Sequence, residues 1–144
     1  MNEIYNITTQ RNKVEELHLE IQGWKSNLDF INDEITFIDH LLNSYAFQPN
    51  TQNLFERLQD YLKRIHKSKE TKKQLQKLIV KHENALGGMI ECTDASCDLT
   101  YYQKHDKLKA SVLDYINNFR DLKAEIFNYA GGIMKKRKPN AEMK

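Results

Sequence analysis

The histidines of this sequence are the residues whose type and spacing could bind a metal ion. His18, His82 and His105 lie in three separate segments. Glu15 stands three residues before His18, one helical turn away on the same face. Neutral imidazoles and carboxylates are ligands for zinc and other transition metals. These four residues are therefore the candidate metal site, with Zn or another transition metal as its ion.

The segment 87–97 carries three possible accessory ligands, which are Glu91, Cys92 and Cys97. The Cys-x4-Cys spacing is wider than the pairs of zinc fingers, and the chain has no second cysteine pair. We expect free, reduced thiols, because the chain carries no secretory signal and the cytoplasm keeps cysteines reduced. A disulfide within the loop is one alternative, and thiols that complete the histidine set are another.

A structural role for the histidines competes with the metal site. Polar residues inside a helical bundle can fix the register of the helices. The sequence holds one Glu-x-x-His motif, whereas a di-iron carboxylate site needs two such motifs and two further glutamates. We therefore expect a polar layer without a cofactor, and keep the metal site as the alternative.

Three apolar seams predict the elements that must position these residues. Apolar side chains recur every three or four residues over Val14 to Tyr45, Leu54 to Leu86 and Tyr101 to Ile133. This is the period of amphipathic helices. The pattern predicts helices over about 12–47, 53–87 and 98–133.

Capping and breaking residues set the expected ends of these helices. Asn12 and Asn53 resemble N-caps, each with a glutamate three residues later, and Asp98 or Thr100 could cap the third helix. Pro49 should end the first helix, and Gly87-Gly88 should end the second. Gly131-Gly132 should weaken the last turn, and Gly23 could make room for a neighbouring helix.

Three helices joined by short links predict an all-α fold. We expect an elongated antiparallel up-down-up three-helix bundle over residues 1–134, followed by a basic, disordered tail at 135–144. Folding the chain at its two links places His18, His82 and His105 in one layer, to within about one turn. The second seam has a polar middle. There Ser68 could accept a large facing ring, and Lys72 could extend its ammonium into water.

Charge is distributed unevenly between the first two helices. Residues 14–45 contain seven acidic residues and one lysine, whereas residues 63–81 contain eight basic residues and one glutamate. We expect these opposite charges to pair across the bundle, so nucleic acid is an unlikely partner for the basic run.

Composition excludes several classes of protein. The net charge is +2, no apolar run reaches the length of a membrane span, and the N-terminus lacks the features of a secretory signal. The sequence contains neither a glycine-rich phosphate loop nor a nucleophile motif with a partnered base. We therefore expect a cytoplasmic protein that is not an enzyme and does not bind a membrane.

A second apolar stripe lies beside the seam of the first helix. It consists of Phe30, Phe37 and Leu41, which recur at helical spacing. The stripe could thicken the core or form a surface for a partner. The leading interpretation is a non-catalytic interaction protein that self-associates through this stripe, as a homo-oligomer or with another helical protein.

Several of these residues also carry a family resemblance over most of the chain. Glu16-Leu17-His18-Leu19-Glu20 followed by Trp24, together with His82-Glu83 and His105, resembles a family of short, uncharacterised three-helix bacterial proteins. The resemblance implies no activity. It favours a role for the histidines. The resemblance also leads us to expect further histidines beside His82 and His105. They are absent from this sequence, which puts a complete metal site in doubt.

Overall fold

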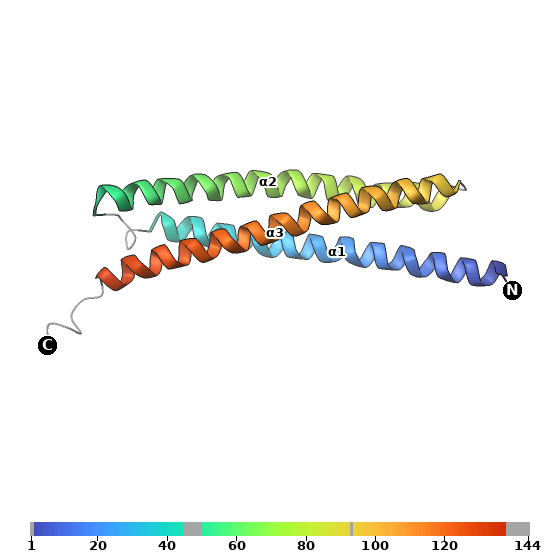
Figure 1. Ribbon diagram of the computed structural model, residues 1–144, viewed down its shortest axis with the longest axis horizontal. Helices are drawn as coiled ribbons and strands as arrows, with labels where there is room; N and C mark the ends of the chain where they lie inside the picture. The colour runs from blue at the N-terminus through green and yellow to red at the C-terminus, as the bar shows by residue number, and fades with distance from the viewer. Residues whose placement is uncertain (1, 45–49, 93, 138–144) are drawn as a thin grey trace. The chain divides into compact units, whose positions relative to one another are not determined.

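The chain forms three long helices in the computed structural model (Figure 1). They are α1 (Asn2–Leu42), α2 (Gln52–Glu91) and α3 (Ala95–Arg137). The structure describes residues 2–44, 50–92 and 94–137, with side chains described over 12–44, 50–92 and 94–134. Helix is the only regular secondary structure in these ranges, which confirms the predicted all-α three-helix bundle.

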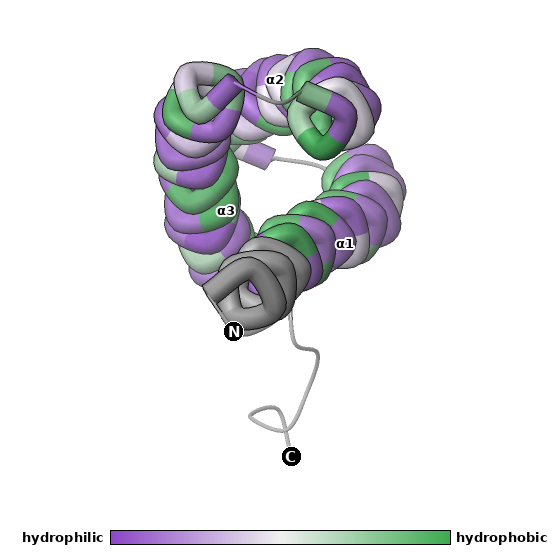
Figure 2. Tube along the Cα trace, turned by 90° about the vertical axis from the view of Figure 1, so that its right-hand side faces the viewer, coloured by the Kyte–Doolittle hydropathy of each residue, from purple (hydrophilic) through white to green (hydrophobic). Residues whose placement is uncertain are grey.

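The predicted seams form the buried core. Apolar residues recur along all three helices (Figure 2), and those of the seams face inward. Burying one such side chain contributes roughly 1.5–3 kcal/mol relative to leaving it in water, so the seams supply the main stabilisation. The side chains with almost no exposed surface come from all three helices: Ile21, Leu28, Ile38, Leu42, Ile65, Ile79, Val112 and Ile126.

The chain divides into two compact units, and each unit takes a segment from every helix. Unit 1 consists of Met1–Ile31 and Lys73–Val112, and unit 2 of Asn32–Lys72 and Leu113–Lys144. Within unit 2, Asn32 contacts Lys72 and Asp39 contacts His66, so α2 runs antiparallel to α1 there. Both units therefore build their cores from three helices.

The helix starts differ from those predicted. α1 begins at Asn2, so Asn12 lies inside the helix and does not cap it. In α2 the cap is Thr51, whose Oγ1 accepts the backbone N–H of Leu54 at 3.2 Å, and not Asn53. In α3 the backbone N–H of Ser96 donates to Asp94 Oδ1 at 3.1 Å, ahead of the predicted caps. The predicted end of α1 at 47 lies outside the described residues, and α1 ends at Leu42.

The glycine pairs do not end their helices. α2 continues through Gly87-Gly88 to Glu91, and α3 continues through Gly131-Gly132 to Arg137. A glycine inside a helix costs about 1 kcal/mol relative to alanine. Burial of Met89 and Ile133 just beyond the two pairs offsets this cost. The first three residues of the expected basic tail thus belong to α3, and 138–144 lie outside the described residues.

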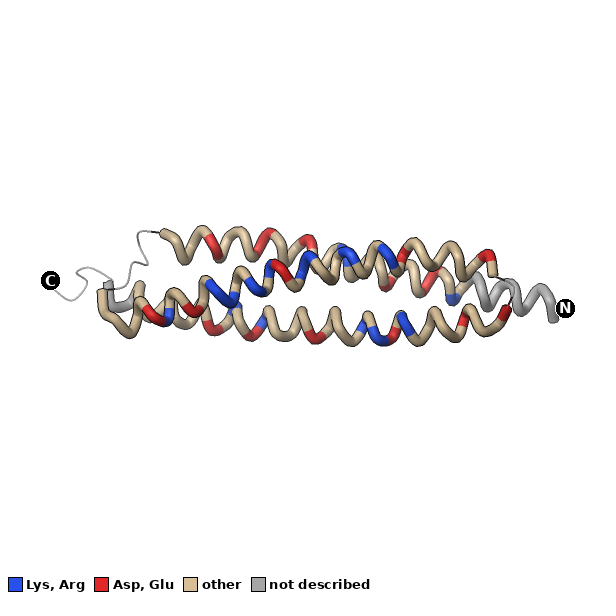
Figure 3. Tube along the Cα trace, turned by 90° about the horizontal axis from the view of Figure 1, so that it is seen from above, with Lys and Arg blue, Asp and Glu red and all other residues tan. Residues whose placement is uncertain are grey.

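The charge pairing between helices differs in part from the prediction. Glu20 and Glu34 of α1 pair with Lys109 and Lys123 of α3, at 3.3 and 2.6 Å. Between α1 and α2, Lys25 pairs with Glu83 at 2.6 Å, with the opposite polarity to that expected, whereas Asp39 of α1 lies 3.4 Å from His66 of α2. Figure 3 shows the acidic positions of α1 and the basic run of α2. The acidic face of α1 is therefore neutralised in part by α3, because helix rotation brings those side chains together.

Candidate functional site

The centre of the candidate site is a pair of buried histidines in unit 1. His82 on α2 and His105 on α3 both occupy seam positions, with exposed fractions of 7% and 3%. Their rings meet edge on, with His82 Nε2 2.9 Å from His105 Nδ1. The sequence prediction that these two histidines face each other is correct.

A carboxylate on α1 continues this contact. His105 Nε2 lies 3.4 Å from Glu20 Oε2, and the same oxygen lies 3.3 Å from the Lys109 ammonium. When neutral His105 donates its Nε2–H to Glu20, its Nδ1 is left to accept the Nε2–H of His82. A chain of hydrogen bonds therefore runs from α2 through α3 to α1.

Burial keeps His82 neutral. Desolvation is the largest of three effects that together lower the pKa of His82 to about 4, and the other two are the electrostatic influence of His105 and of Lys104. At neutral pH the His82 ring is therefore an uncharged hydrogen-bonding group inside the core.

Aromatic rings enclose the two imidazoles. Tyr101 stacks on His82 with a centroid distance of 4.2 Å and an interplanar angle of 11°, and Trp24 lies 4.7 Å from the His105 ring. The Tyr101 hydroxyl donates to the backbone carbonyl of His82 at 3.1 Å, and burial raises the pKa of Tyr101 to about 12. These contacts fix the positions of both rings.

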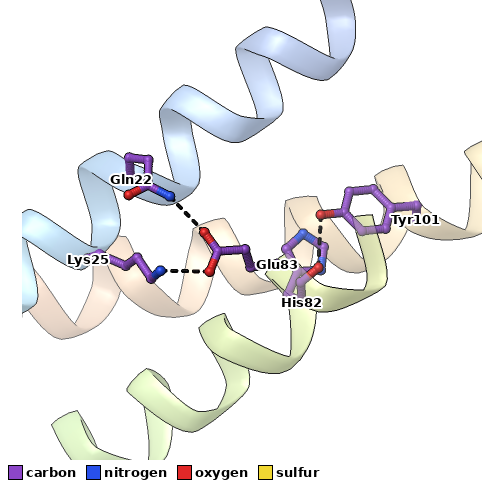
Figure 4. Close-up of polar contacts among 5 residues, drawn as sticks. All are labelled: Gln22, Lys25, His82, Glu83 and Tyr101. Carbon is purple, nitrogen blue, oxygen red and sulfur yellow. Dashed lines mark hydrogen bonds and ion pairs between the residues drawn. The ribbon is translucent and has the colours of Figure 1, made fainter. Parts of the chain in front are cut away.

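Glu83, beside His82, connects the site to α1. Lys25 Nζ and Gln22 Nε2 donate to its two carboxylate oxygens at 2.6 and 2.7 Å (Figure 4). The hydrogen bond from Lys25 is the main cause that holds the pKa of Glu83 below its usual value. The carboxylate thus stays ionised and ties α1 to α2 at the level of the histidine pair.

The proposed ligand set is not gathered into one place. His18 and Glu15 are exposed on α1, and Glu91 is exposed at the end of α2. Among the described residues, no group of three or more His, Cys, Asp or Glu side chains is placed to hold a metal ion. A one-turn uncertainty in helix register is enough to separate His18 from the other two.

The cysteines form a disulfide, so the expectation of free thiols is wrong. Cys92 and Cys97 are bonded to each other, with their Cα atoms 6.4 Å apart. The chain reverses direction between α2 and α3, and this brings the two residues within bonding reach. Neither sulfur is then a thiolate that could complete a metal site.

Sequence reasoning did not assign roles to Glu20, Trp24 or Tyr101. One signal was present, since Tyr101 stands four residues before His105 and therefore on the same face of α3. The contacts of Glu20 and Trp24 depend on how α1 is rotated against α3, which one sequence does not specify. The hydrogen bonds of this network connect residues of all three helices.

The aromatic stripe of α1 is a second candidate surface. Phe30 and Phe37 have exposed fractions of 64% and 59%, and Leu41 is half-buried. In unit 2, Phe37 follows Glu34 by three residues and Phe127 follows Lys123 by four, so each ring lies one turn from the Glu34–Lys123 pair. Phe127 is itself 44% exposed, so apolar surface occurs on both helices beside this pair.

Comparisons with protein-family models, with curated proteins and with solved structures found no match for this chain.

Over the residues that the structure describes, none of the helices is long and apolar enough to cross a membrane.

Proposed function

We propose that this protein is a non-catalytic interaction protein that self-associates through the stripe of Phe30, Phe37 and Leu41 on α1. The observation that carries the proposal is the exposure of the two phenylalanine rings, each more than half in solvent. Burial of one such ring in an interface would contribute on the order of 2 kcal/mol. Aromatic residues exposed on one face typically mark a protein–protein contact.

The histidine pair supports the non-catalytic part of the proposal. Its imidazoles are buried and bonded to each other and to Glu20, so they leave little space for a substrate beside them. The hydrogen bonds and ring contacts of this layer stabilise the bundle that presents α1. In this proposal the histidine layer gives unit 1 a stable core, and α1 provides the contact surface.

The test is the oligomeric state of a stripe variant. Phe30→Gln/Phe37→Gln removes both rings and keeps good helix formers at both positions. We expect wild-type protein to self-associate in sedimentation velocity, and the double variant to be monomeric with unchanged helicity. Phe55→Gln is the matched control, because Phe55 is also an exposed ring, at 47%, but lies on α2.

Two results would contradict the proposal. One is wild-type protein that stays monomeric at the highest concentration measured. The other is a double variant that loses its helical circular dichroism, which would place the rings in the core.

A further inference from the structure

A groove of about 300 Å³ lies between α2 and α3 of unit 1. Gly88 and Met89 line it from α2, and Tyr101 and Lys104 line it from α3. A Cβ atom added at Gly88 would meet no other atom within 4 Å. Packing within the described chain therefore does not require glycine here, although glycine weakens a helix. The absent side chain leaves the groove open.

One lysine lines this groove, and helical spacing places three more on the helix faces that extend from it. Lys104 is the lining residue, and Lys107 follows one turn later on the same face of α3. On α2, Lys81 stands seven residues before Gly88 and Lys77 a further turn back, which places both on the groove's face.

These lysines are exposed, and within the described part of the chain no carboxylate pairs with them. Lys81 and Lys104 each precede one member of the His82–His105 pair, so lysines of both helices lie at the same level of unit 1. Like charges one helical turn apart on a helix repel each other, and this repulsion favours binding of an acidic partner.

The exposed face of α1 in unit 1 is complementary to the groove in charge, because it is acidic and the groove is basic. Leu19 and Phe30 are eleven residues apart, three helical turns, with exposed fractions of 69% and 64%. Gly23 lies between them, and a Cβ there would also meet nothing within 4 Å. Glu15 and Glu16 lie one turn before Leu19, and both are exposed. The face is therefore apolar, acidic and open to close approach.

Charge decides which surface can receive this face. Glu15 and Glu16 are exposed on α1 and give this face a negative charge, so a basic surface receives it better than a second acidic α1 does. The groove offers lysines on both helices, and an open position at Gly88 where an approaching helix can pack closely.

We propose that the acidic, apolar face of α1 from one copy docks in the lysine-lined groove between α2 and α3 of a second copy. This inference rests on the proposed self-association and names the surface that receives α1. When each copy offers its α1 to the other, the contact occurs twice and closes as a symmetric dimer.

Charge reversal tests the docking directly. Lys81→Glu/Lys104→Glu in one chain, and Glu15→Lys/Glu16→Lys in another, should each reduce self-association at least tenfold. Mixing the two variants should restore assembly, because the mixture again pairs opposite charges. Lys63→Glu/Lys69→Glu is the control with the same change in net charge on α2 away from the groove, and it should associate like wild type.

The two neighbouring glycines give a test without any change of charge. Gly88→Met fills the groove, and Gly87→Met adds the same side chain at a position that does not line it. Both variants should melt at or above the wild-type temperature, because methionine favours a helix and meets open space. Only Gly88→Met should weaken self-association.

The results separate this inference from the proposed function. Wild-type protein that associates through Phe30 and Phe37, but is unaffected by Lys81→Glu/Lys104→Glu, would overturn the docking site and leave the self-association standing. A mixture of the two charge variants that fails to assemble would overturn it as well. A chain that stays monomeric and binds inorganic polyphosphate through Lys81 and Lys104 would overturn both proposals.

Discussion

The two units interrupt their apolar cores with polar layers of different chemistry. In unit 1 the layer is the His82–His105 pair, enclosed by aromatic rings and continued to Glu20. In unit 2 the Tyr115 hydroxyl donates to the carbonyl of Ser68 at 3.0 Å and lies 3.0 Å from the Ser68 hydroxyl. Nearby, the buried Lys72 ammonium donates to the Asn32 side chain.

The two polar layers should respond differently to pH, because their side chains titrate in different ranges. An imidazole changes its charge near neutral pH, whereas hydroxyl and amide groups do not. We therefore expect mild acid to destabilise the layer of unit 1 and to leave the Ser68–Tyr115 layer unaffected. Three measurements test this difference.

The largest effect is expected from His105→Ala. The change removes a buried ring packed on Trp24 and leaves the Nε2–H of His82 without its partner. We expect a loss of about 4 kcal/mol in the free energy of unfolding, measured by urea denaturation at pH 7.5. The control is His18→Ala, which removes an exposed imidazole and should change stability by less than about 0.5 kcal/mol. Equal effects of the two changes would show that the pair does not stabilise the core.

The pH dependence of stability is the second test. The pKa of His82 is about 4 in the folded chain and about 6.5 in an unfolded one. Between these values the unfolded chain binds a proton that folded His82 does not. The free energy of unfolding should therefore fall by up to about 3 kcal/mol as the pH is lowered through this window.

A variant without the imidazole isolates this contribution from the titration of carboxylates. Urea denaturation at pH 7 and pH 4.5 should show a smaller loss for His82→Gln than for wild type. Identical losses would mean that His82 does not couple folding to protons in this range.

The smallest effect is expected in unit 2. Tyr115→Phe keeps the ring and removes the hydroxyl that bonds to Ser68. We expect a loss of about 1 kcal/mol, with the same dependence on pH as wild type between pH 7 and pH 4.5. A variant whose pH dependence differed from that of wild type would remove the contrast between the two layers.

Periodicity in the sequence determined the architecture. The spacing of apolar residues specifies which face of each helix is buried, and this is a local property of the chain. The seam, the three helices and the contact between His82 and His105 were predictable for that reason. The prediction that Ser68 accepts a large ring is also confirmed, since Tyr115 occupies that place.

Polar contacts between helices depend on how each helix is rotated and on how far it is shifted along its neighbour. These contacts follow from the tertiary packing and could not be predicted from apolar spacing. His18 lies outside the histidine pair, Glu20 completes it, and the acids of α1 pair with lysines of α3. Lys72 is buried with a partner on α1, although its stem was expected to lead the ammonium into water. A shift of one turn changes each of these contacts and leaves the apolar pattern unchanged.

The ends of the helices depend on the free energy of burying side chains as well as on the helix propensity of the residues at those ends. Gly87-Gly88 is a strong stop signal, yet burial of Met89 beyond it favours continuation to Glu91. That continuation brings Cys92 to the point where the chain turns back, within reach of Cys97. The spacing of apolar residues thus specifies which residues are buried in three helices. The packing of those helices decides where they end and which polar groups meet, because burial free energy outweighs the local preference of one or two residues.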